Sequence, residues 1–151
     1  MASMTSSRLA FVVALALVVA ACGASSTATS GFGNRSAMEA EARDEFNSLQ
    51  WPPGVQMRTF PPSGSDTFQT GYGMTRIGDQ WVCAWSGDWL ESRLTDEARA
   101  TADLQTLDKV KQIHAWAYWD DPGRTIVLDA ISKARLGDPE PMVNMRTLWA
   151  C

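Results

Sequence analysis

Histidine is almost absent from this 151-residue sequence, in which His114 is the only one. A zinc site built on histidine needs more than one imidazole ligand, so neither structural nor catalytic zinc is expected. A serine hydrolase using His114 would carry a Gly-x-Ser-x-Gly elbow, and none occurs. The glycine-rich patterns that bind nucleotide phosphates are missing too. The sequence therefore predicts no cofactor, no metal and no nucleotide-binding fold.

Basic residues are scarce as well. Lysine occurs three times, and the formal net charge is -4 at pH 7. Nucleic acids and anionic lipid headgroups attract proteins through basic patches. Nucleic acid is therefore not an expected partner of this acidic chain.

No apolar run in the sequence is long enough to cross a membrane. The longest, residues 9–21, contains thirteen residues and follows Arg8. A spanning helix needs about 20 residues, whereas the apolar part of a secretory signal has roughly 7 to 15. We therefore predict that residues 1–21 are a signal peptide.

The end of this run indicates how the chain is processed. Val19-Ala20-Ala21-Cys22 resembles the lipobox at which bacterial lipoprotein precursors are cleaved and lipidated. The resemblance implies that Cys22 carries the lipid and that the mature chain begins there. The alternative is an ordinary signal peptide that is cleaved after Ala24 or Ala28.

Residues 22–33 are expected to form the lipid-anchor cysteine and a flexible tether, because residues 23–33 are Gly, Ala, Ser and Thr apart from Phe32. Residues 34–151 are enough for one globular domain with one core. A doubly acylated chain stays on the membrane durably. The predicted location is the extracytoplasmic face of the cell membrane, with the membrane as a partner through the lipid.

Cysteine is also rare, and its count is odd. If Cys22 is lipidated, Cys83 and Cys151 remain as one disulfide in an oxidising compartment. That bridge would close a loop of about 70 residues and stabilise the fold by roughly 4 kcal/mol. The rival interpretation, a catalytic thiol with His114 as its base, lacks a recognisable cysteine-protease signature.

The first half of the domain shows one helix and then irregular structure. Ser36 and Glu39 form a capping box that predicts a helix through Leu49. Residues 51–78 then contain four prolines and five glycines, which exclude continuous helix. Within them we expect one short strand at Val55 to Phe60, and a loop at Gln69 to Gly78.

The second half has helical periodicity. From Asp79 onward, Trp81, Trp85 and Trp89 mark one stripe of a helix, although a strand at residues 80–85 is an open alternative. Thr95, followed by two acids, predicts a further helix start, and that helix should run to about Trp119.

The last segment is predicted to contain a turn and two helices. Asp121-Pro122-Gly123 is expected to be the turn. A helix over Ile126 to Leu136 should end at Gly137, and another should begin at Asp138-Pro139 with Met142, Met145 and Trp149 facing inward. The fold class predicted is mainly α, a small single-domain helical bundle with an irregular Pro/Gly-rich segment and one disulfide.

Residues 50–151 contain a series of short motifs: Pro52-Pro53-Gly54, Cys83-Ala84-Trp85, Trp89-Leu90, Gly137-Asp138-Pro139 with Pro141, and a terminal cysteine. In this order they resemble the motifs of small actinobacterial exported or lipid-anchored proteins of unknown function. The resemblance implies the same location and a Cys83 to Cys151 pair, and it supplies no catalytic residue. The chain departs from the pattern before Cys151, where a polar residue is expected in place of Ala150.

Aromatic residues give the one hint of a ligand. Indole faces stack on sugar rings, so Trp116, Tyr118 and Trp119 are candidate ligand-facing aromatics for a cell-wall glycan. The alternative is that they belong to the core, as the spacing favours for the earlier tryptophans. The function expected is binding or structural support in the cell envelope, with a glycan or an envelope protein as the partner.

An enzymatic role is the weaker alternative. Asp88, Glu91, Asp120 and Asp121 are the acids nearest the aromatic segments, and paired acids can hydrolyse glycosides. Solvated helix faces produce the same spacing. No catalytic residue is therefore predicted.

Overall fold

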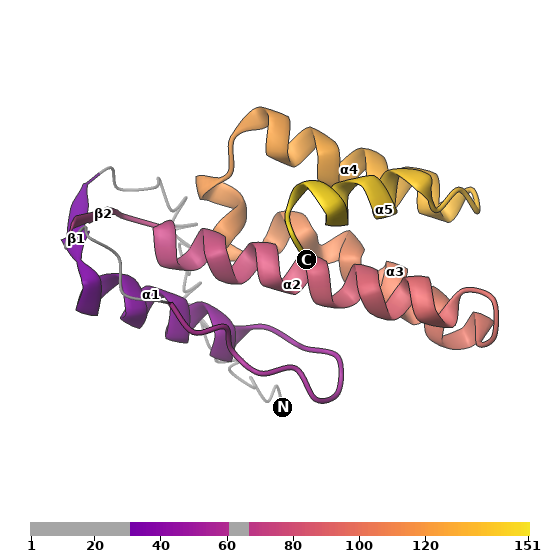
Figure 1. Cartoon of the computed structure of the whole chain (residues 1–151), viewed down its shortest axis with the longest axis horizontal. Helices are drawn as coiled ribbons and strands as arrows, with labels where there is room; N and C mark the ends of the chain where they lie inside the picture. The colour runs from indigo at the N-terminus through magenta and orange to yellow at the C-terminus, as the bar shows by residue number, and fades with distance from the viewer. Residues whose placement is uncertain (1–30, 61–66) are drawn as a thin grey trace, which may run out of the picture.

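The computed structural model describes residues 31–60 and 67–151, and this part of the chain is mainly helical (Figure 1). The predicted fold class is confirmed. The signal peptide, Cys22 and residues 23–30 of the tether lie outside the described residues. In chain order the elements are β1 (Phe32–Asn34), α1 (Arg35–Ser48), β2 (Thr67–Gln69), α2 (Tyr72–Ser92), α3 (Glu97–Leu107), the 3-10 helices η1 (Asp108–Gln112) and η2 (His114–Tyr118), α4 (Asp121–Arg135) and α5 (Glu140–Leu148).

Helix α2 runs through the middle of the molecule, with α1 along one side and α4 and α5 along another (Figure 1). The tryptophan stripe explains this position, because Trp81, Trp85 and Trp89 are all buried in the core. The helix over these residues and its apolar stripe are confirmed, and the strand alternative is wrong.

Helix α2 also begins seven residues earlier than predicted, at Tyr72, so the loop expected at Gln69 to Gly78 is wrong. Gly71 precedes it in the left-handed region, with φ +86°. The glycines in this segment serve close packing. A Cβ at Gly73 would lie 2.1 Å from the Met38 carbonyl oxygen of α1, and one at Gly78 would lie 2.4 Å from the Ala115 Cβ of η2.

The domain begins earlier than predicted. Phe32 pairs with Gln69 in the antiparallel β1–β2 ladder, so the last two residues assigned to the tether belong to a strand. The N-cap of α1 is Asn34, whose Oδ1 accepts from the Ala37 N–H at 3.0 Å, and not Ser36. Both Asn and Ser are good caps, and strand pairing places Asn34 at the transition.

No strand forms at Val55 to Phe60. This extended segment bonds to a side chain of α2: the Gln80 amide accepts from Arg58 N at 2.9 Å and donates to Gln56 O at 2.6 Å. These two bonds satisfy one N–H and one C=O of the segment without a partner strand.

The chain leaves the α-helical path after α3. Asp96 caps α3, close to the predicted start at Thr95, but the helix ends at Leu107 and not near Trp119. Ile113 is extended, with φ -73° and ψ 148°, and separates η1 from η2. This break turns residues 114–118 toward the N-terminal half of α2, where Ala115 packs against Gly78.

The C-terminal helices largely follow the prediction. The expected turn at residues 121–123 is instead the first turn of α4, capped by Asp120, whose Oδ1 accepts from Gly123 N at 2.8 Å. Gly137, with φ +83°, ends the α4 segment as predicted. Helix α5 begins after Pro139, one position later than expected, and buries Met142 and Met145.

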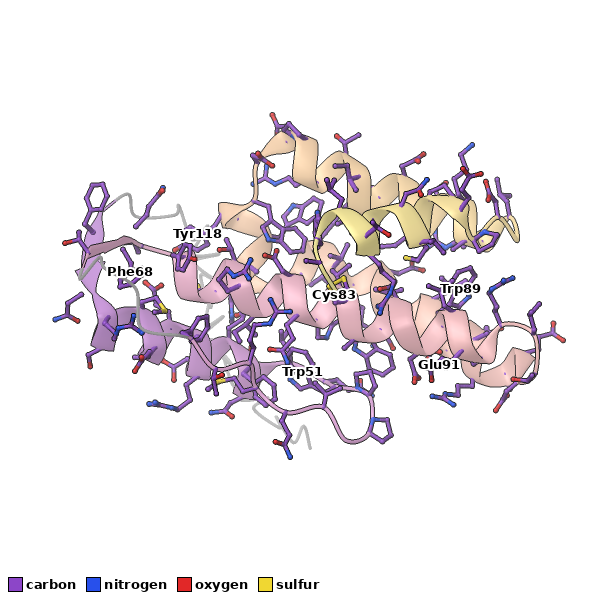
Figure 2. All side chains as sticks on the ribbon, viewed as in Figure 1. Trp51, Phe68, Cys83, Trp89, Glu91 and Tyr118 are labelled. Carbon is purple, nitrogen blue, oxygen red and sulfur yellow. A yellow bond between two sulfur atoms is a disulfide. The ribbon has the colours of Figure 1, made fainter. Side chains whose placement is uncertain are left out.

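A disulfide joins Cys83 of α2 to Cys151, with their Cα atoms 5.4 Å apart, and confirms the predicted pair (Figure 2). The chain reaches Cys83 by reversing at Ala150, which has φ +53°, while Cys151 N donates to Arg146 O at 3.0 Å. Within residues 31–60 and 67–151, no helix combines the length and the apolarity needed to cross a bilayer.

Candidate functional site

The three candidate ligand-facing aromatics do not form one surface. Trp119 is 8% exposed and packs edge-on against Trp116 and Trp149, with ring centroids 5.8 and 5.5 Å apart. It belongs to the core, so its prediction as a ligand-facing residue is wrong. The prediction for Trp119 rests only on its closeness in the sequence to Trp116 and Tyr118, the two aromatic residues of η2.

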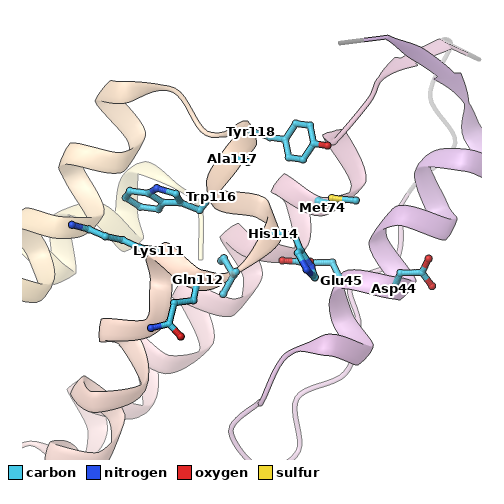
Figure 3. Close-up of a pocket in the computed structure, with 10 residues that line it drawn as sticks. Asp44, Glu45, Met74, Lys111, Gln112, His114, Trp116, Ala117 and Tyr118 are labelled. Carbon is cyan, nitrogen blue, oxygen red and sulfur yellow. The ribbon is translucent and has the colours of Figure 1, made fainter. Parts of the chain in front are cut away.

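Trp116 and Tyr118 are half-buried and both line a cleft of about 450 Å³. Figure 3 shows their rings extending from η2 in opposite directions, so they flank the cleft and do not make a flat platform. Each of the two rings also contacts a neighbouring group. The Arg124 guanidinium lies 5.4 Å from the Trp116 ring centroid, and the Tyr118 ring fills the space beside Gly71.

The cleft lies where α1, the first turn of α2 and the η1–η2 segment meet (Figure 3). Its apolar and aromatic walls come mainly from Met74, Ile113 and Trp116. Polar groups stand among them: Asp44 from α1, Lys111 and Gln112 from η1, and the pair formed by Glu45 and His114.

Glu45 and His114 make the most specific contact in this cleft. The Glu45 Oε2 and the His114 Nδ1 are 2.8 Å apart, and Glu45 Oε1 accepts from the Ala115 N–H at 3.1 Å. Glu45 is 1% exposed, whereas the His114 side chain is 68% exposed. A buried carboxylate therefore holds a solvent-facing imidazole.

Local structure explains why an acid can be buried there. Met38, Ala42 and Glu45 follow one another at helical spacing and form the inward face of α1. The Glu45 carboxylate has both oxygens in hydrogen bonds, which compensates for its removal from water. Sequence reasoning missed Glu45 because its partner lies 69 residues away.

Three of the four acids considered for hydrolysis are engaged in separate contacts, and the fourth is exposed. Asp88 is paired with Arg99, and its Oδ2 accepts from Arg99 Nε at 3.1 Å. Asp120 caps α4, Asp121 is exposed beside Arg124, and Glu91 is exposed on α2. They do not converge on the cleft.

Another acid, Asp103, lies near Asp88. Asp103 of α3 is 2% exposed and accepts from Ser92 Oγ at 3.1 Å. Burial raises the pKa of Asp103, and the nearby Asp88 carboxylate raises it further. This network joins α2 to α3. Among the residues that the structure describes, no group of three His, Cys, Asp or Glu side chains could hold a metal ion.

In comparisons with known proteins, no family model, no curated protein and no solved structure matched the chain. The resemblance to small actinobacterial envelope proteins therefore stays a prediction.

Proposed function

We propose that this protein is a binding protein of the cell envelope, held by lipid at Cys22 on the extracytoplasmic face of the membrane. The apolar run at residues 9–21 and the lipobox-like Val19-Ala20-Ala21-Cys22 support the location. The disulfide between Cys83 and Cys151 is compatible with an oxidising compartment.

The ligand site in this proposal is the cleft between α1 and η2, and the ligand is a fragment of cell-wall glycan. One observation carries this: aromatic rings and hydrogen-bonding side chains line a single cleft of about 450 Å³. Small-molecule sites have about this size and combine apolar walls with few polar groups. A sugar presents C–H faces to rings such as Trp116 and hydroxyls to groups such as Gln112 and Lys111.

The test is calorimetric titration of the full-length protein with soluble cell-wall polysaccharide fragments. Trp116→Ala should weaken binding by about tenfold, which corresponds to ~1.4 kcal/mol. Phe32→Ala is the matched control, because Phe32 is an exposed aromatic outside the cleft, and its affinity should equal that of the wild type. If the wild type takes up no glycan, the ligand assignment is wrong and a structural accessory role replaces it.

A further inference from the structure

We propose that His114 is a catalytic general base and that the α1–η2 cleft hydrolyses carboxylic esters, with Glu45 as the positioning residue. This activity goes beyond glycan binding. It uses the same cleft but rests on a different observation, the geometry of the Glu45–His114 pair.

The hydrogen bond to Glu45 determines which imidazole nitrogen is free. An ionised carboxylate only accepts hydrogen bonds, so Nδ1 carries the proton and donates it to Oε2 over 2.8 Å. In neutral imidazole the other nitrogen, Nε2, then has a free electron pair. Within the described part of the chain, Nε2 has no hydrogen-bond partner, and the side chain is 68% exposed.

Glu45 is itself fixed, so the imidazole is positioned before a substrate arrives. Its carboxylate is held by the Ala115 N–H at 3.1 Å as well as by His114, and it is buried at the junction of α1 and η2. Figure 3 shows the two side chains lying together at this junction. Preorganised groups of this kind need no rearrangement when the reaction occurs.

The surroundings supply charges of both signs. Asp44 of α1 and Lys111 of η1 line the cleft, Tyr118 of η2 contributes its phenol, and Lys109 of η1 lines an adjoining hollow that His114 also borders. From α2, the cleft receives the uncharged Met74.

The reaction uses water as the co-reactant. His114 Nε2 takes a proton from water while the water oxygen bonds to the ester carbonyl carbon, and the carbonyl π electrons move to the carbonyl oxygen. When this tetrahedral adduct collapses, the carbon–oxygen bond to the alcohol breaks with its electron pair. The Nε2 proton passes to the departing oxygen. One ester and one water become one acid and one alcohol, and the imidazole is neutral again.

A purely structural pair makes a different prediction. If Glu45 and His114 only hold α1 against η2, removing either one changes stability and leaves no catalytic deficit, because there is no catalysis to lose. Measuring hydrolysis separates the two interpretations.

The experiment follows the hydrolysis of p-nitrophenyl acetate by the purified full-length protein across a range of pH. We expect the wild type to exceed free imidazole at equal concentration by at least about tenfold, since positioned general bases contribute 10²-fold or more. His114→Gln should remove this activity. Glu45→Gln should lower it by about tenfold and shift the pH profile, a change that a structural role would not produce.

Glu39→Gln is the matched control for Glu45→Gln. Glu39 lies on the same helix, but its side chain is 41% exposed and pairs with Arg35, so its substitution should leave the rate and the pH profile unchanged. A wild type no faster than imidazole, or a His114→Gln variant that keeps the rate, would overturn the proposal.

A second measurement needs no substitution and covers the case in which a variant does not fold. Because His114 is the only histidine, diethyl pyrocarbonate followed by hydroxylamine should abolish and then restore the activity of the wild type. Activity that survives modification, or is not restored, overturns the proposal. Glycan binding without hydrolysis would defeat this inference and leave the proposed function standing, and hydrolysis without glycan binding would do the reverse.

Discussion

At the scale of single residues, the pair formed by Glu45 and His114 shows what a sequence conceals. His114 was noticeable because it is the only histidine, but its partner is one of many acids in the chain. A signal for Glu45 did exist: it falls on the inward stripe of α1 with Met38 and Ala42. An acid on an apolar stripe needs a partner, and only the fold identifies that partner.

Asp79 is a second residue whose behaviour depends on its surroundings. It lies on α2 with its side chain 24% exposed and pairs with Arg76 at 3.3 Å. Burial raises the pKa of the Asp79 carboxyl above its ordinary value, by more than Arg76 lowers it. The nearby Trp119 indole N–H also lowers this pKa, by less than burial raises it. The fold therefore favours protonated Asp79 more than the unfolded chain does.

This shift predicts a pH effect on stability. A raised carboxyl pKa contributes its full stabilisation below the pKa of the unfolded chain and loses it as pH rises through the folded-state pKa. Asp79→Asn, which stays neutral, should therefore gain stability relative to the wild type as pH increases from about 3 to about 7. Urea unfolding at several pH values measures the difference.

The control for this prediction is Asp129→Asn, because Asp129 is exposed on α4. The difference in unfolding free energy between Asp129→Asn and the wild type should change less over the same pH range. If the advantage of Asp79→Asn shrinks as pH rises, the direction assigned to the pKa shift is wrong.

At the scale of elements, the position of α2 depends on its glycines. In a sequence, glycines in a segment without apolar periodicity indicate a loop. On this ground a loop is predicted at Gln69 to Gly78. In the structure Gly73 and Gly78 let α1 and η2 approach α2 more closely than any side chain would allow. Tertiary contact outweighs the helix propensity of glycine here.

Gly73→Ala should destabilise the protein by about 1–3 kcal/mol, because overpacking of a dense contact costs that much. The added Cβ would meet the Met38 carbonyl and the Ala42 nitrogen, both backbone atoms that cannot move alone. Chemical denaturation gives the free energy of unfolding.

Gly87→Ala is the matched control on the same helix. There the nearest atom is the tip of the Arg146 guanidinium at 2.9 Å, which belongs to a flexible side chain. The higher helix propensity of alanine partly offsets the displacement of the guanidinium from Cys83 O and Ser86 Oγ, so the variant should lose less stability than Gly73→Ala. Equal losses in the two variants would contradict the close-packing explanation for Gly73.

The end of α3 at Leu107 is the other structural feature that apolar periodicity did not predict. Leu107, Val110 and Ile113 are buried at three-residue spacing, so the segment keeps the apolar pattern of a continuing helix as far as Ile113. The extended Ile113 redirects the chain and places His114 against Glu45. Apolar spacing records burial, and it does not record a change of direction between two short 3-10 turns.

At the scale of the whole molecule, the disulfide links the C-terminus to the central helix. It joins residues 68 positions apart, and a loop of that length raises stability by roughly 4 kcal/mol in the chain-entropy model. Arg146 reinforces the same junction, because it donates to Cys83 O and, at 3.1 Å, to Ser86 Oγ.

The proposed membrane location of the whole chain depends on Cys22. Replacing Cys22 with serine should move the protein from the membrane fraction to the soluble fraction, because lipid attachment needs the thiol. Fractionation followed by immunoblotting measures the shift, and Ser26→Ala serves as the control because it keeps both the Cys22 thiol and the Cys83–Cys151 disulfide. Membrane retention of the Cys22→Ser protein would contradict the lipoprotein prediction.

The sequence by itself determined the helical class, the buried stripe at Trp81, Trp85 and Trp89, the end of α4 at Gly137 and the pairing of Cys83 with Cys151. Those features follow from spacing and local backbone preference, which act within a few residues, and from a cysteine count once Cys22 is assigned to the predicted lipid. The tertiary structure alone decided where α2 begins, where the chain turns at Ile113 and which acid meets His114. Those features depend on what packs against a residue from far along the chain, and no local pattern contains that information.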